Sequence, residues 1–208
     1  MFSGFFRYFI LLMIACLCLA AVEPPAQAQA QLRSPFLELG QATLTPSGWA
    51  DFCSRYKQDC EKAWDARSDI HASDANVALI NRVNKQVNAS IKPLSDYDHW
   101  HDIDRWDYAE DGQGDCEDYA LQKRKRLLAE GFPQGALLIT VVRDGNLDGH
   151  AVLTVRTDRG DLILDNLSDD LHLWWRTPYR FMKIQSQQNP NVWVSIGAAH
   201  GRPQISSR

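Results

Sequence analysis

Residues 114–120 read Gly-Asp-Cys-Glu-Asp-Tyr-Ala and place one cysteine, Cys116, in the first turn of a predicted helix. Asp115 is a suitable N-cap for this helix, and Gly131 followed by Pro133 ends its apolar pattern. The free N–H groups at a helix start favour a thiolate, whereas neighbouring carboxylates raise the pKa of a thiol. The stretch therefore indicates either an inert cysteine or a site in which another group cancels the negative charge of the acidic residues.

Predicted helices dominate the chain before this stretch, and predicted strands dominate it afterwards. Ser73 or Asp74 can cap a helix whose apolar residues recur at helical spacing and which Pro93 ends. The strand-like segments are residues 136–142, 150–156, 161–166 and 191–196. Helices first and antiparallel strands second predict an α+β fold.

Other segments carry weaker signals. Residues 30–45 are predicted to be an irregular lead-in, and one or two helical turns are expected within residues 48–65. Residues 91–114 read as a long ordered loop that is rich in Asp, His and Trp. Trp174 and Trp175 are expected in the core.

A turn at residues 157–160 fixes the register of the two strands around it, because it pairs Arg156 with Asp161. In this register His150 and Asp165 are diagonal neighbours on one face of the sheet, within side-chain reach of each other. A slip of one residue would move Asp165 to the opposite face. The hairpin therefore predicts contact between these two side chains.

Cys116, His150 and Asp165 have the composition of a catalytic triad: a nucleophile, a general base and a carboxylate that orients the base. In the simpler interpretation, His150 is a core histidine and Asp165 belongs to a turn. The unpaired cysteine at a helix start favours the triad.

The first 28 residues have the features of a secretory signal peptide. A short positive start at Arg7 precedes an apolar run over residues 8–22, and small residues follow at 26–28. The alternative is a membrane anchor, but the run is shorter than the ~20 residues that a spanning helix needs. We expect cleavage near Gln29 and a protein that works outside the cytoplasm, in the periplasm.

The remaining chain suits one domain over residues 29–200, followed by a flexible tail over residues 201–208. The net charge of −4 argues against nucleic acid or an anionic membrane as a partner. No later stretch is long and apolar enough to span a membrane, so we expect no stable membrane insertion once the signal is cleaved.

Three cysteines remain after the leader: Cys53, Cys60 and Cys116. In an oxidising compartment the first two are the natural pair, because they are close in sequence. A continuous helix would hold them about 10 Å apart, so a disulfide requires a break between them. The alternative is two buried reduced thiols, and in either case Cys116 is left unpaired.

Several blocks together resemble the bacterial transglutaminase-like cysteine proteinases. They are GDCEDYALQKRKRLLAEG at 114–131, GHAVLTV at 149–155, LILDNL at 162–167 and FCSRYKQDC at 52–60. The resemblance implies a papain- or transglutaminase-like fold, with the catalytic helix packed on an antiparallel sheet. It also implies that Cys116 is the nucleophile, His150 the general base and acid, and Asp165 the residue that orients His150.

The best-known members of this family are periplasmic proteases that release adhesins from the cell surface. The resemblance therefore implies a protein or peptide substrate, with a surface adhesin as the specific expectation. It also implies an inner-membrane receptor that sequesters the protease.

The same resemblance implies calcium beside the site, held by the acids that flank the cysteine, Asp115 and Glu117. A bound ion would neutralise these carboxylates and order the preceding loop. In the alternative interpretation, Asp115 is only an N-cap and Glu117 only favours the helix dipole. Trp106 is a candidate second donor to the oxyanion, beside the Cys116 N–H group.

The sequence thus predicts a periplasmic cysteine endopeptidase that acts through an acyl-enzyme. Two alternatives stay open. The same triad serves an acyltransferase or amidase, such as a transglutaminase or a hydrolase of peptidoglycan peptides. A non-catalytic binding module with an unreactive Cys116 is the alternative from another class.

Overall fold

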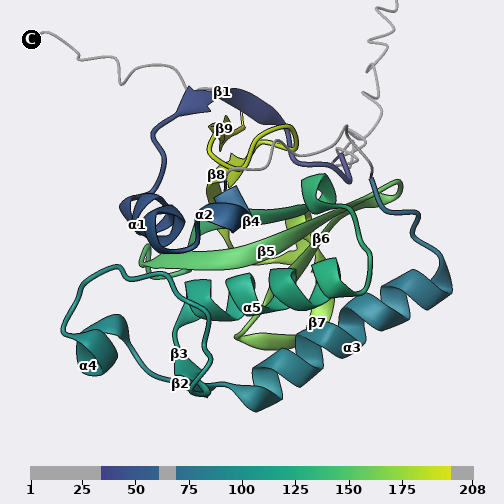
Figure 1. The fold of residues 1–208 in the computed structure, drawn as a ribbon. Coiled ribbons are helices and arrows are strands. Elements are labelled where there is room, and N and C mark those ends of the chain that lie inside the picture. Colours follow the sequence, from purple (N-terminus) through teal and green to yellow (C-terminus); the bar gives the residue numbers. More distant parts are fainter. Residues whose placement is uncertain (1–33, 61–68, 198–208) are drawn as a thin grey trace, which may run out of the picture. The chain divides into compact units, whose positions relative to one another are not determined.

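The computed structural model describes residues 34–60 and 69–197 (Figure 1). The predicted leader, residues 1–28, and the predicted tail, residues 201–208, lie outside these ranges, so those domain boundaries stay predictions. Within the described residues, no helix combines the length and the apolar character that crossing a membrane requires.

A seven-stranded antiparallel sheet forms one layer of the fold. Its strands are β1 (Leu39–Thr43), β4 (Leu137–Arg143), β5 (Gly149–Thr157), β6 (Gly160–Asp165), β7 (Ser168–Leu173), β8 (Arg180–Gln185) and β9 (Trp193–Ile196). They lie in the order β1-β9-β8-β4-β5-β6-β7, and each neighbouring pair is antiparallel. The two central strands, β4 and β5, are almost entirely buried, as their runs of valine, leucine and isoleucine predict.

The two long helices form the second layer. The helices of the described residues are α1 (Ser47–Arg55), α2 (Lys57–Cys60), α3 (Asp74–Ser90), α4 (Asp96–Trp100) and α5 (Cys116–Ala129). The long helices α3 and α5 lie on the same face of the sheet, with α5 across β4 to β6 and α3 against α5 and β7 (Figure 1). Leu121 and Leu127 of α5 are fully buried between the layers, together with Ile139 and Leu153 of the sheet. The α+β prediction is confirmed.

Helix α3 begins and ends where its sequence predicts. The Ser73 hydroxyl accepts a hydrogen bond from the Asn76 N–H group at 3.2 Å and caps the first turn. The helix ends at Ser90, and Ile91 is already extended two residues before Pro93. A buried stripe of apolar side chains at helical spacing, Ile80, Val83 and Val87, faces the core.

Some local expectations were wrong. Residues 39–43, expected to be irregular, form β1 by pairing with β9, a partner about 150 residues away in sequence. The expected loop over residues 91–114 contains α4 and a parallel pair of short strands, β2 (Lys92–Pro93) and β3 (Gln113–Gly114). Strands β7 and β8 were also missed, because their sequences mix charged and apolar residues.

The two tryptophans expected in the core lie at its margin. Trp174 and Trp175 are half-buried in a short 3₁₀ helix, η2 (Trp174–Arg176). Trp174 packs edge-on against Phe181, whereas the Arg176 guanidinium lies 4.9 Å from the centre of the Trp175 ring. A second 3₁₀ helix, η1 (Gln134–Ala136), connects α5 to β4.

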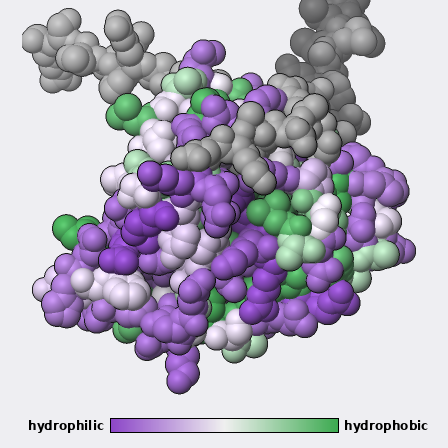
Figure 2. Space-filling model, in the orientation of Figure 1, coloured by the Kyte–Doolittle hydropathy of each residue, from purple (hydrophilic) through white to green (hydrophobic). Residues whose placement is uncertain are grey.

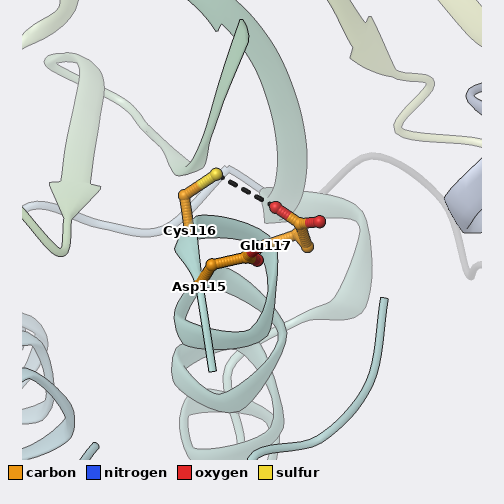
Figure 3. Close-up of side chains that lie close together, drawn as sticks. All are labelled: Asp115, Cys116 and Glu117. Atoms are coloured by element: carbon orange, nitrogen blue, oxygen red, sulfur yellow. Dashed lines mark hydrogen bonds between the residues drawn. The ribbon is translucent and has the colours of Figure 1, made fainter. Parts of the chain in front are cut away.

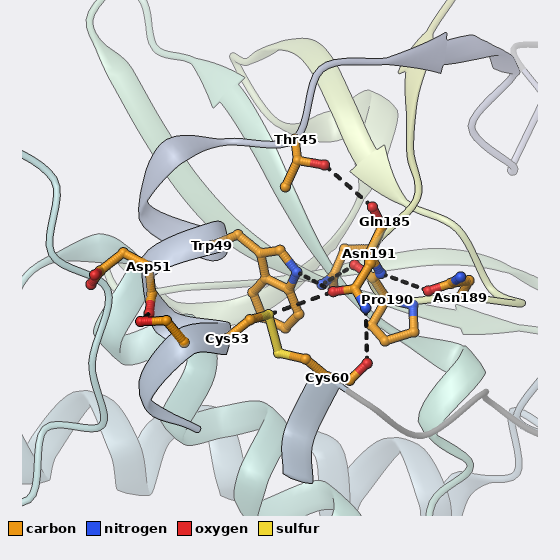
Figure 4. The surroundings of a disulfide bond; sticks show 10 residues. Thr45, Trp49, Asp51, Cys53, Cys60, Gln185, Asn189, Pro190 and Asn191 are labelled. Carbon is orange, nitrogen blue, oxygen red and sulfur yellow. Dashed lines mark hydrogen bonds between the residues drawn. A yellow bond between two sulfur atoms is a disulfide. The ribbon is translucent and has the colours of Figure 1, made fainter. Parts of the chain in front are cut away.

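A disulfide joins Cys53 and Cys60, as predicted (Figure 4). The helix breaks at Tyr56, between α1 and α2, and this break brings the two Cα atoms to 5.6 Å. Asn191 ties the bridge to the sheet, because its side-chain amide donates to the Cys60 carbonyl at 2.9 Å and accepts from the Trp49 indole at 3.3 Å.

The surface in view in Figure 2 carries mostly polar side chains, with apolar side chains gathered in small separate groups. Large apolar residues with high exposure include Ile103, Leu44 and Tyr97, which come from different segments of the chain. Single exposed residues of this kind are normal for a protein with a buried core.

The disulfide should contribute about 2–3 kcal/mol to the free energy of unfolding, because it closes a short loop in the unfolded chain. We expect the double variant Cys53→Ser/Cys60→Ser to lose that amount in urea unfolding. Reductant supplies the control, since it should destabilise the wild type to the level of the variant and leave the variant unchanged. Equal stability of the two proteins without reductant would contradict the prediction.

Candidate active site

Helix α5 begins at Cys116, and a buried carboxylate fixes its first turn. Asp118, which is 1% exposed, accepts hydrogen bonds from the N–H groups of Asp107 at 2.7 Å and Asp115 at 3.3 Å. Gly114 is needed beside it, because a Cβ atom at this position would lie 2.4 Å from the Asp118 Oδ2 atom. The motif thus docks the preceding loop onto the start of the helix.

The Cys116 thiol has two hydrogen-bond partners. Its Sγ atom donates to the Glu117 Oε2 atom at 3.0 Å (Figure 3) and accepts from the Ala151 N–H group of β5 at 3.3 Å. The second contact brings the thiol against β5, at the residue that follows His150. Cys116 is the free cysteine among the described residues.

The electrostatics of this arrangement favour the protonated thiol. Burial, then the negative charges of Glu117 and Asp115, raise the pKa of the Cys116 thiol well above its usual value. Burial and the charge of Asp115 likewise raise the pKa of the Glu117 carboxyl. The conflict between the thiol and its acidic neighbours, which the sequence indicates, is present in the folded chain.

The hairpin of β5 and β6 has the predicted register. Arg156 pairs with Asp161, and Thr157 pairs with Gly160 across the turn. The predicted contact follows, with the His150 Nε2 atom 3.0 Å from the Asp165 Oδ1 atom. Both side chains are largely buried.

Asp165 is held as an anion by several donors. Burial raises the pKa of its carboxyl, but hydrogen bonds from His150, from the Tyr179 hydroxyl and from the Leu167 N–H group outweigh this effect and leave the pKa below its usual range. Tyr179 also packs on the His150 ring, with the ring centres 5.3 Å apart. The imidazole is therefore fixed from two sides.

The structure brings two residues of the predicted triad into contact and places the third close to them. His150 and Asp165 contact each other, and Cys116 lies against the residue that follows His150. Among the described residues no hydrogen bond joins Cys116 to His150, because the thiol is turned towards Glu117. The Nε2 atom of His150 faces Asp165, so its other ring nitrogen, Nδ1, is the one left for Cys116.

Two overlapping groups of side chains offer ligand atoms for a metal ion. Ligand atoms of Asp96, Asp115 and Asp118 all lie within 4.8 Å of one another, and the same holds for those of Asp115, Cys116 and Glu117. Asp115 is common to both groups, and its Oδ1 atom is buried with no hydrogen-bond partner among the described residues.

A family model described as bacterial transglutaminase-like cysteine proteinase (BTLCP) matches residues 39–201. The chain belongs to this family. It is therefore a cysteine peptidase, as the sequence predicted. No curated protein matches the chain.

Solved structures of Legionella pneumophila LapG share the fold. The calcium-bound structure is 24% identical, with a TM-score of 0.50, and covers 62% of this chain and 75% of its own. The EGTA-treated structure is 26% identical, with a TM-score of 0.49, and covers 59% of this chain and 72% of its own. Another LapG structure is 25% identical, with a TM-score of 0.46, and covers 57% of this chain and 68% of its own. The family model and the calcium-bound LapG structure together confirm the transglutaminase-like fold.

Some features of this peptidase could not be predicted from its sequence. Tyr179 follows an irregular segment, and no pattern connects it to Asp165. Asp96 was one of many loop acids, and only the tertiary structure shows that its N–H group donates to Asp115 at the start of the catalytic helix. Trp106 is not supported as an oxyanion donor, because its indole N–H group donates to Asp104 at 2.8 Å.

Proposed function

We propose that this peptidase is a periplasmic endopeptidase in which Cys116 is the nucleophile, His150 the general base and acid, and Asp165 the orienting carboxylate. The contact between His150 and Asp165, 3.0 Å across two strands, is the observation that carries the proposal. The thiol held against the neighbouring Ala151 N–H group supports it further.

In this reaction Cys116 transfers its proton to His150, and the Sγ atom attacks the carbonyl carbon of the substrate peptide bond. His150 then donates the proton to the leaving amine as the C–N bond breaks, which leaves an acyl-enzyme. A water molecule, activated by His150, attacks the thioester and releases the carboxylic acid and the free thiol. Asp165, as an anion, stabilises the imidazolium that forms twice in this cycle.

The start of α5 supplies a donor to the oxyanion. The N–H group of Cys116 is in the first turn, so the helix offers it no carbonyl partner. The helix dipole adds a favourable field of about 0.3–1 kcal/mol for a thiolate. One pKa unit corresponds to about 1.36 kcal/mol, so this field alone does not offset the burial and acidic charges around Cys116.

His150 should determine the reactivity of Cys116. In calcium-saturated protein near neutral pH, we expect His150→Ala to slow the alkylation of Cys116 by iodoacetamide about tenfold or more, because the thiol loses its base. Peptide mapping assigns the label, and circular dichroism checks the fold. The control is His71→Ala, since His71 is an exposed histidine paired with Asp158. Equal rates for wild type and His150→Ala would refute the triad.

The chemistry of the acidic groups fits a calcium ion. Burial, together with the charges of Asp115 and neighbouring acids, raises the pKa of Asp118 to about 8 and that of Asp96 to about 6. A hard divalent cation prefers oxygen ligands of this kind, and the buried Asp115 Oδ1 atom has no partner among the described residues. LapG of the same fold has been solved in a calcium-bound form.

We therefore propose that Asp115 holds calcium together with Asp96 and Asp118, and with Glu117 from the adjoining group. When bound, the ion would neutralise the carboxylates beside the thiol. Glu117, as a calcium ligand, would no longer accept the hydrogen bond of the Cys116 thiol, which would leave the thiol available to His150. Asp115, which also accepts from the Asp96 N–H group at 3.3 Å, links the loop to the catalytic helix.

Calcium should stabilise the metal-stripped protein, by about 2.7 kcal/mol at a hundredfold excess over Kd. Magnesium should act weakly, because it demands tighter octahedral geometry. We expect Asp115→Asn to abolish the calcium response in titration calorimetry and thermal melts, whereas Glu110→Gln, an exposed acid of the same segment, should keep it. Absence of binding to wild type at millimolar calcium would contradict the proposal.

The location in the periplasm is supported by two features. The apolar leader over residues 1–28 has the pattern of a cleaved signal, and the Cys53–Cys60 disulfide belongs in an oxidising compartment. By analogy with its family, we propose that the substrate is a surface adhesin and that an inner-membrane receptor controls access to it.

The substrate can be identified by proteomics of proteins released from cells. Cells with the wild-type enzyme should release a large surface protein that cells with Cys116→Ala retain, and the new terminus marks the cleavage site. Cross-linked products in place of cleaved ones would indicate acyl transfer. Identical released proteins in the two strains would argue against adhesin release.

A further inference from the structure

The backbone of residues 105–107 lies against the start of the catalytic helix and donates to two of the proposed calcium ligands. The Arg105 N–H group donates to the Asp96 Oδ2 atom. The Asp107 N–H group donates to the Asp118 Oδ1 atom at 2.7 Å. Groups that donate to metal-binding carboxylates fix the orientation of those carboxylates, and their loss weakens metal binding about 10–100-fold. The position of this segment therefore determines how two ligands are oriented.

Two residues at the end of α1 hold this segment in place. The Arg55 guanidinium donates to the Asp107 Oδ2 atom at 2.7 Å and to the Trp106 carbonyl oxygen. The Tyr56 hydroxyl donates to the other carboxylate oxygen of Asp107, Oδ1. The Asp107 side chain is largely buried, and hydrogen bonds to a guanidinium are stronger than those between neutral groups. Asp107 thus connects the end of α1 to the start of α5 through direct contacts.

The first turn of α1 holds the other end of the same segment. The Ser47 hydroxyl and the Gly48 N–H group both donate to the Asp104 Oδ2 atom, at 2.8 Å and 2.9 Å. The Trp106 indole donates to the Asp104 Oδ1 atom at 2.8 Å. The Trp106 ring packs so closely on Gly48 that a Cβ atom there would lie 2.2 Å from the ring. Helix α1 therefore grips residues 104–107 at both ends.

The residues that make this grip are themselves fixed. The Cys53–Cys60 disulfide closes the loop that contains Tyr56. The Tyr56 ring stacks on Phe52, with the ring centres 4.7 Å apart, and meets Tyr108 edge-on at 5.0 Å. Both of these aromatic partners are buried. The Tyr56 hydroxyl is thus presented to the segment in a defined orientation.

We propose that Arg55 and Tyr56 are positioning residues of the calcium site, because they hold the backbone segment 105–107 that orients two of its ligands. The inference rests on the calcium site proposed above. It gives a role at the catalytic centre to the block FCSRYKQDC at 52–60, which contains both residues and the disulfide but supplies no member of the triad.

Calorimetric titration of metal-stripped protein with calcium tests this inference. Tyr56→Phe keeps the ring contacts and removes only the hydroxyl, so we expect it to weaken calcium binding about tenfold. Arg55→Met removes the ion pair with Asp107 and should weaken binding at least as much. The control is Asp51→Asn, because Asp51 is an exposed second partner of Arg55, at 2.9 Å, and its loss leaves the pair with Asp107 in place. This variant should bind calcium like the wild type.

A double-mutant cycle separates positioning from a general loss of stability. Asp107→Ala keeps the N–H group that donates to Asp118 but removes the carboxylate that Tyr56 holds. Because Tyr56 acts through this carboxylate, adding Tyr56→Phe to Asp107→Ala should cause no further loss of calcium affinity. Losses that add in the double variant would overturn the proposal, as would wild-type affinity in Tyr56→Phe.

If Asp107→Ala does not fold, amide NMR signals of metal-free Tyr56→Phe replace the cycle. Displaced signals of Arg105 and Asp107 together with weaker calcium binding support the proposal, and unmoved signals overturn it. Failure of the calcium site itself is seen separately, as absence of binding to the wild type, and this inference then fails with it. A wild type that binds calcium, beside a Tyr56→Phe variant of equal affinity, refutes the inference alone.

Discussion

The antiparallel pairing of β5 with β6 is the constraint on which the site depends. Side chains alternate between the two faces of a strand, so the register decides which residues can meet. Pairing of Arg156 with Asp161 puts His150 and Asp165 on one face at contact distance. Helix α5 packs on the face of the sheet that carries Leu153 and Leu164, and its first residue brings a thiol to the Ala151 N–H group.

The parts of the fold that local sequence determines were predictable. The cap of α3, the break between the two cysteines and the β5–β6 hairpin each follow from a few neighbouring residues. The β1–β9 pairing and the place of β8 beside β4 were not, because they join segments far apart in the chain. Tyr179 and Asp96 were missed for the same reason, since their importance comes from neighbours that only the tertiary structure supplies.

The acidic residues around Cys116 have a structural effect and an electrostatic effect. Asp118 is structural, because its carboxylate holds the loop at Asp107 and caps the first turn of α5. Asp115 and Glu117 face the thiol and oppose its ionisation. One short motif therefore shapes the start of the helix and also keeps the thiol protonated. In the calcium site proposed above, a bound cation would remove this second effect.

The sheet also has a consequence for the order of folding. Strand β1 comes early in the chain, but its partner in the sheet is β9, close to the end of the described residues. Contacts of such long sequence separation form slowly, and a chain is synthesised from its N-terminus. The β1–β9 pair cannot form until residue 196 has been synthesised. The edge of the sheet formed by β1 and β9, opposite β7, is therefore the last part that can form. The folded protease has to wait for it.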